Sequence, residues 1–186
     1  MVDAARQPLI EVKAYTEVEK VEGFVGNFKV TLREKAKYVR ADRCNGCAAC
    51  AKACPVEVPN YFEMNLAPRK AAYIPMSQSV PLIYNIDMDA CIHCYKCVEA
   101  CGALEAIDFS MEDKIIEEDI GAIVVATGFG HFDPTPMTEY GYGRFPNVIT
   151  AMEMERLNNS ASATHGRVVR PSDNVRPQRL AIINCV

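Results

Sequence analysis

Two short stretches near the start of the chain alternate apolar and charged residues. Residues 10–15 and residues 28–33 both follow this pattern. A period of two is typical of strands with one buried face, so we expect antiparallel strands here, with turns at Glu22-Gly23 and Gly26-Asn27. Residues 34–43 are charged and unpatterned, which predicts a domain boundary.

The C-terminal part contains two continuous apolar runs. Residues 121–126 form the first run and end in Thr127-Gly128, and residues 180–186 form the second. Such runs are typical of strands buried on both faces of a parallel sheet. The second run ends with the chain, so its sheet would need strands from elsewhere, and we expect the chain to be a piece of a longer protein.

The remaining segments carry helix and loop patterns. Residues 147–157 predict a short helix, with Thr150 as its N-cap and Glu153 three residues later. Residues 158–178 are rich in Asn, Ser, Pro and Arg and predict a loop. Residues 55–90 contain too many prolines for a long helix, and we expect an irregular, partly extended excursion.

Composition excludes several classes of protein. The chain has 186 residues, is 49% hydrophobic and carries a formal net charge of -4. It has no apolar run of the roughly 18 residues that a membrane span requires, and residues 1–20 lack a signal-peptide core. The acidic balance argues against nucleic acid as a partner. We therefore expect a cytoplasmic protein with no membrane span.

Cysteine is the unusual component. Eight of the nine cysteines lie between Cys44 and Cys101, in two tight groups of four. Disulfide-rich chains are small and secreted, and their cysteines are more evenly spread. The grouping therefore favours ligation of a metal ion or cluster.

The two groups form an internal repeat. Residues 44–54 and 91–101 both read CxxCxxCxxxC, at an offset of 47 residues. Three thiolates at this spacing can wrap a compact turn around three corners of one cubane, and in two-cluster ferredoxins the fourth cysteine of each run ligates the other cluster. The predicted ligand sets are therefore Cys44, Cys47, Cys50 and Cys101 for one 4Fe-4S cluster, and Cys91, Cys94, Cys97 and Cys54 for the other.

Zinc is the main alternative to an iron-sulfur cluster as the group that these cysteines bind. Zinc sites favour two separated pairs of ligands, whereas CxxCxxC supplies a third thiol at the same turn. Pro55 matches the proline that usually ends such a cluster motif, and Gly102 departs from it. The cysteine region closely resembles bacterial-type two-cluster ferredoxins, whose fold is a pseudo-twofold βαββαβ unit. Residues 41–55 and 88–109 carry this match, and the longer segment between them either covers the clusters, contacts a partner or is loop filler.

Further stretches of the chain carry a second resemblance: residues 15–30, 54–60, 73–75, 122–129, 140–144, 146–148 and 169–173. Together, over roughly residues 8–186, they resemble the A subunit of heterodisulfide reductase. This resemblance implies an α+β chain in which a ferredoxin-like domain with two 4Fe-4S clusters is inserted in a partial FAD-binding, thioredoxin-reductase-like α/β domain. Residues 8–33 and 115–186 would belong to the flavin domain and residues 34–114 to the insert.

The resemblance also implies roles for residues outside the two motifs. Thr127 and Gly128 would contact FAD in the full-length protein. The chain has no GxGxxG motif to hold the FAD pyrophosphate. A plain turn between a strand and a loop explains these two residues equally well. Cys185 would ligate a further cluster, or serve as a small buried hydrophobe. His93 is expected to be exposed or to donate a hydrogen bond to a cluster sulfur.

The implied function is electron transfer within a multisubunit oxidoreductase of the heterodisulfide reductase type. Two 4Fe-4S clusters would pass electrons between FAD and a partner such as hydrogenase, formate dehydrogenase or ferredoxin, and the segment alone would only carry electrons. Two alternatives stay open. One is a related subunit of a quinone-modifying or hydrogenase-linked complex, and the other is a structural metal module.

Overall fold

A computed structural model describes residues 2–128 and 130–184. The chain divides into two compact units. The first contains the residues up to Glu57 together with Lys70–Ala126, and the second contains Val58–Arg69 together with the residues from Thr127 onward. No helix within the described ranges is long and apolar enough to span a membrane.

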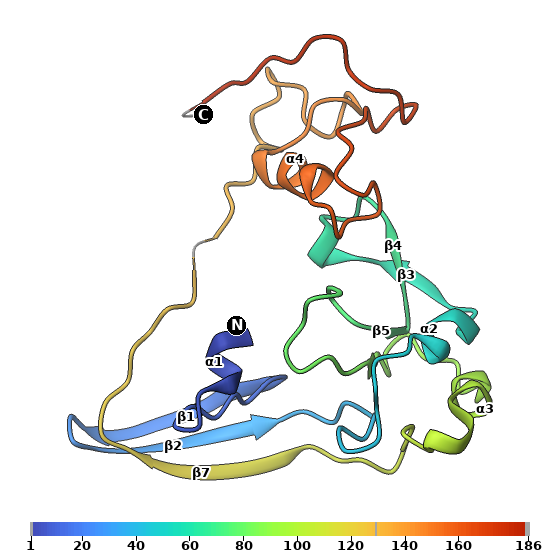
Figure 1. Cartoon of the computed structure of the whole chain (residues 1–186). Helices are drawn as coiled ribbons and strands as arrows, with labels where there is room; N and C mark the ends of the chain where they lie inside the picture. Colours follow the sequence, from blue (N-terminus) through green and yellow to red (C-terminus); the bar gives the residue numbers. More distant parts are fainter. Residues whose placement is uncertain (1, 129, 185–186) are drawn as a thin grey trace. The chain divides into compact units, whose positions relative to one another are not determined.

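The first unit contains a three-stranded antiparallel sheet. Its strands are β1 (Thr16–Phe24), β2 (Asn27–Glu34) and β7 (Lys114–Ile120), with β2 in the centre (Figure 1). Strand β2 contains the predicted strand of residues 28–33. A short helix, α1 (Val2–Arg6), precedes the sheet.

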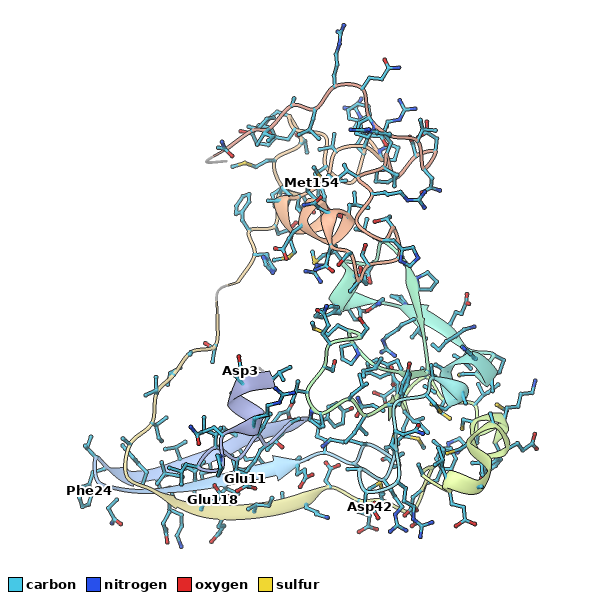
Figure 2. All side chains as sticks on the ribbon, viewed as in Figure 1. Asp3, Glu11, Phe24, Asp42, Glu118 and Met154 are labelled. Carbon is cyan, nitrogen blue, oxygen red and sulfur yellow. The ribbon has the colours of Figure 1, made fainter. Side chains whose placement is uncertain are left out.

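The other predicted strand is wrong. Residues 10–15 are not a strand; the Lys13 ammonium lies 2.8 Å from a carboxylate oxygen of Glu118 in β7 and 2.6 Å from one of Glu11. Figure 2 labels Glu11 and Glu118. These two carboxylates raise the pKa of Lys13 through hydrogen bonds. The Lys13–Glu118 ion pair and single backbone hydrogen bonds, such as the one from the Lys35 N–H to the Tyr15 carbonyl oxygen at 3.0 Å, thus connect this segment to the sheet in place of a strand ladder.

The hairpin turn is displaced from both predicted positions. Gly23 pairs with Phe28 inside β1, and Phe24 pairs with Asn27, so the turn lies at Val25-Gly26. A Cβ atom at Gly23 would come within 2.1 Å of the Asn27 carbonyl oxygen. Gly23 therefore marks a close approach of two strands rather than a turn, a role that the sequence pattern alone does not distinguish.

The cysteine region packs as two crossed halves around a common core. The segment before the first motif bridges the segment after the second at Val39 and Ile107. Reciprocally, β5 (Ala72–Tyr73) after the first motif pairs with β6 (Asn85–Ile86) before the second. The motif helices are α2 (Ala49–Ala53) and α3 (Lys96–Cys101), followed by the 3-10 turn η2 (Gly102–Leu104). The buried core is Val39, Cys50, Ala72, Ile86, Cys97 and Ala106.

The excursion between the motifs is irregular, as predicted. It contains β3 (Glu57–Pro59), the 3-10 turn η1 (Tyr61–Glu63) and β4 (Pro68–Lys70), and β3 pairs with β4. It contains no α-helix, in agreement with its prolines.

The second unit contains one α-helix, α4 (Ala151–Asn158), among its described residues. The Thr150 hydroxyl accepts a hydrogen bond from the Glu153 backbone N–H at 3.2 Å, and the Glu153 carboxylate accepts one from the Thr150 N–H. This capping box confirms the predicted start of the helix. Of the predicted loop at residues 158–178, residues 159–178 form no helix or strand, as expected, and Asn158 is the last residue of α4.

The prediction of a buried strand at residues 121–126 is wrong. The prediction of a strand at residues 180–186 is also wrong for residues 180–184, the part that the structure describes. Neither segment forms a strand, and Val124 and Val125 are 90% and 78% exposed. A strand needs neighbouring strands to satisfy its backbone and cover its side chains. No described residue provides that pairing.

Candidate metal centres

The first cavity is lined by the four cysteines of the first predicted set. Cys44 and Cys47 come from the loop before α2, Cys50 from α2, and Cys101 from the end of α3. The cavity and the open solvent space at its mouth together have a volume of about 290 Å³. Apolar side chains complete much of its wall: Val39, Ala48, Tyr84, Leu104, Ala106 and Ile107.

The second cavity repeats this arrangement with the roles of the motifs exchanged. Cys91 and Cys94 come from the loop before α3, Cys97 from α3, and Cys54 from just after α2. It encloses about 320 Å³, again with open space included. The rest of its wall consists of Val56, Ala71, Ala72, Ile86, Ile92 and Tyr95.

Helical geometry explains why the fourth cysteine crosses over. Cys50 and Cys54 are four residues apart at α2, so they lie about 6 Å apart along the helix axis. Cys50 reaches the first cavity and Cys54 the second. From α3, Cys97 reaches the second cavity and Cys101 the first.

Matching backbone conformations wrap the two cysteine loops. Gly46 and His93 occupy equivalent positions with φ of 72° and 52°, and Ala48 and Tyr95 follow with φ of 65° and 56°. For a residue other than glycine, a left-handed conformation costs about 1–3 kcal/mol and persists only where surrounding interactions enforce it. The loops therefore need a compensating interaction, which thiolate ligation would supply.

Burial opposes ionisation of the deepest thiols. Burial is the main cause that raises the pKa of Cys50 to about 12; the neighbouring thiols of Cys44, Cys47 and Cys97 add to it, and the hydrogen bond from the Ala51 N–H acts in the opposite direction. Burial likewise raises the pKa of Cys97. Because bound metal deprotonates a coordinating thiol, a cationic centre in each cavity would offset this cost.

Among the described residues, the structure neither pairs the motif cysteines in disulfides nor gathers them around one ion. All eight motif cysteines are free thiols. Within residues 2–128 and 130–184, no three His, Cys, Asp or Glu side chains converge closely enough to hold one ion. Tetrahedral zinc with bonds of about 2.3 Å would place its sulfurs about 3.8 Å apart. Four thiols spread around a cavity fit a larger polynuclear centre better.

Backbone amides point at cysteine sulfurs in both motifs. The N–H of His93 donates to Cys91 Sγ, and the N–H of Ala106 donates to Cys101 Sγ, both at 3.4 Å. The imidazole of His93 is exposed, and its ring centre lies 5.9 Å from that of Phe109. His93 thus contacts the cysteine through its backbone, and its side chain is exposed, one of the two expected outcomes.

Several wall residues could not be recognised from the motifs. Ala106 and Ile107 reach the first cavity because they pair with the segment at Val39, and Tyr84 reaches it from the excursion. The sequence indication for them is the βαββαβ fold of the ferredoxins that the cysteine region resembles. Pairing across the repeat, rather than proximity in sequence, brings these residues to the site.

The remaining predicted residues lie away from the cavities or outside the described chain. Thr127 and Gly128 are exposed at the start of the second unit, so contacts with FAD stay a prediction. Cys185 falls outside the described residues. The second unit has a hollow beside α4, whose described lining includes His131 and Arg170 but no cysteine.

Comparison with known proteins agrees with both the motifs and the flanks. Residues 43–107 match the 4Fe-4S dicluster domain. The whole chain is 48% identical to the iron-sulfur A subunit of the CoB--CoM heterodisulfide reductase of Methanocaldococcus jannaschii. It is 50% identical to an A subunit of the same enzyme from Methanopyrus kandleri, and 46% identical to the A subunit of the H(2):CoB-CoM heterodisulfide,ferredoxin reductase of Methanothermobacter marburgensis.

Each of these matches covers 100% of this chain and 28% of the relative. The chain thus spans little more than a quarter of the length of these relatives. The resemblance predicted from the sequence is confirmed over the whole chain, and the ferredoxin-like, mixed α and β character of the predicted fold is confirmed for the cysteine region.

Proposed function

We propose that this chain, a segment of the family of heterodisulfide reductase A subunits, carries single electrons through two 4Fe-4S clusters. Cys44, Cys47, Cys50 and Cys101 would hold the first cluster, and Cys54, Cys91, Cys94 and Cys97 the second. The observation that carries this proposal is the pair of cavities, each lined by three cysteines of one motif and the fourth cysteine of the other.

The protein residues perform three tasks at these cavities. The thiolates hold the clusters, which supply one-electron redox chemistry when bound. Apolar walls limit contact with water, and this disfavours the additional negative charge of the reduced state. The N–H groups of His93 and Ala106 favour that charge, because they donate to ligand sulfurs. Electron exchange between the cavities is favoured because α2 and α3 each line both.

We further propose that residues 34–114 form a domain inserted into a flavin domain built from residues 8–33, residues 115–186 and chain beyond this segment. Glu34 and Lys114 are paired neighbours at the ends of β2 and β7. An inserted domain requires its two connections to lie side by side, and this pairing supplies that geometry. The flavin would be FAD, with Thr127 and Gly128 as contacts.

In the full-length protein, the clusters would connect this FAD with other subunits of the reductase and with hydrogenase, formate dehydrogenase or ferredoxin. The relatives include a heterodisulfide,ferredoxin reductase linked to H(2) and another linked to H(2) or formate, which supports donors of this kind. A related subunit of a quinone-modifying or hydrogenase-linked complex would use the same cavities and differ only in its partner.

Iron, acid-labile sulfide, zinc and flavin should be counted on anaerobically purified protein, followed by EPR after dithionite reduction. We expect about eight iron and eight sulfide per chain, with an EPR signal from two interacting clusters. Flavin should be low, because the chain lacks GxGxxG. About two zinc without sulfide would instead establish a structural metal module.

A further inference from the structure

The first cysteine loop is covered by a side chain from the excursion. A Cβ atom at Gly46 would lie 3.0 Å from Leu82 Cδ2 and 3.2 Å from the Leu82 carbonyl oxygen. Leu82 therefore rests directly on the turn between Cys44 and Cys47. Tyr84, two residues later, lines the first cavity itself.

The second cysteine loop is covered by its own side chains. Ile92 and Tyr95 line the second cavity. The rings of His93 and Tyr95 lie 5.9 and 5.5 Å from Phe109, the latter edge to face. This loop thus supplies a bulky cover without any residue from the excursion.

The repeat explains the difference between the loops. The positions equivalent to Ile92, His93 and Tyr95 are Asn45, Gly46 and Ala48. These smaller residues leave open the space above the first loop, and Leu82 occupies it. Leu82 is still 45% exposed, so its outer side faces solvent and its inner side faces the loop.

We propose that Leu82 is the residue by which the excursion shields the first cluster from water and holds its reduction potential down relative to an uncovered cluster. This inference rests on the proposed two-cluster function. Water stabilises the more negatively charged reduced state, so an apolar cover disfavours reduction at the site beneath it. The excursion is then a cover for one cluster rather than loop filler.

The test is an EPR-monitored redox titration of anaerobic, cluster-loaded protein. Leu82→Ala and Leu82→Gln should shift the midpoint potential of the first cluster to more positive values and leave the second unchanged. Leu82→Met keeps an apolar cover and should retain the wild-type value. Leu9→Ala, at a leucine that is 94% exposed, is the matched control. Cys47→Ser and Cys94→Ser variants assign the two signals.

A second measurement is the rate of iron loss to a chelator, which should rise for the first cluster in Leu82→Ala and Leu82→Gln only. Unchanged potentials and rates in both variants would overturn the inference, and so would equal changes at both clusters. If Leu82→Ala does not load, the comparison of Leu82→Gln with Leu82→Met decides. A wild-type protein without clusters would refute the proposed function instead.

Discussion

At the scale of single residues, the cysteines and their nearest neighbours differ in how far the sequence reveals them. The eight ligand candidates follow from spacing alone, because CxxCxxC fixes three thiols on one turn. Leu82 has no such pattern; it meets Gly46 only through the folded excursion. Local spacing therefore suffices to name candidate ligands, whereas covering residues depend on contacts distant in sequence.

Gly46 provides a stability prediction. Gly46→Ala would place a side chain at φ of 72° and against Leu82, so we expect destabilisation of about 1–3 kcal/mol, seen as a lower midpoint of thermal unfolding of the cluster-loaded protein. Gly26→Ala is the matched control, since Gly26 has φ of 93° but nothing within 4 Å of a Cβ. The contact with Leu82 is unimportant if both variants lose the same stability.

At the scale of elements, the structure confirms a prediction where the interactions that form the element lie within its own sequence. Helix α4 was predicted because its capping box lies within its own sequence. The apolar run at residues 121–126 satisfied the pattern of a buried strand but has no described strand to pair with. Residues 10–15 likewise showed alternation, yet Lys13 is held by carboxylates on either side. Strands depend on partners that a local pattern does not contain.

Thr150→Ala tests the element-scale account. Removal of the cap hydroxyl leaves the Glu153 N–H without its acceptor, so α4 should lose about 1 kcal/mol of stability. Thr150→Ser keeps the hydroxyl and should behave like wild type. Hydrogen exchange of the α4 amides is the measurement, and equal protection in all three proteins would contradict the capping role.

At the scale of the molecule, the cysteine region has little apolar core. Its buried cluster of six residues includes Cys50 and Cys97 themselves. A core this small stabilises weakly, and natural domains of this kind use metal centres as an additional source of stability. The crossed ligand sets would join the two halves of the repeat, so cluster binding and folding should be coupled.

Anaerobic removal of iron should therefore unfold the cysteine region. We expect residues 36–57 and 70–109 of the first unit to lose hydrogen-exchange protection after chelation, while the amides of α4 in the second unit keep theirs. Reconstitution with iron and sulfide should restore protection. A cysteine region that remains protected without iron would show that its apolar core suffices.

The crossed assignment of the cysteines is the central claim, and one pair of variants tests it most directly. Cys54→Ala and Cys101→Ala should be compared by Mössbauer and EPR spectroscopy on anaerobic protein, with Cys47→Ser and Cys94→Ser as references for the two clusters. Cys54→Ala should perturb the cluster of Cys91, Cys94 and Cys97, and Cys101→Ala that of Cys44, Cys47 and Cys50. Loss in each variant of the cluster held by the motif that contains the substitution would contradict the account.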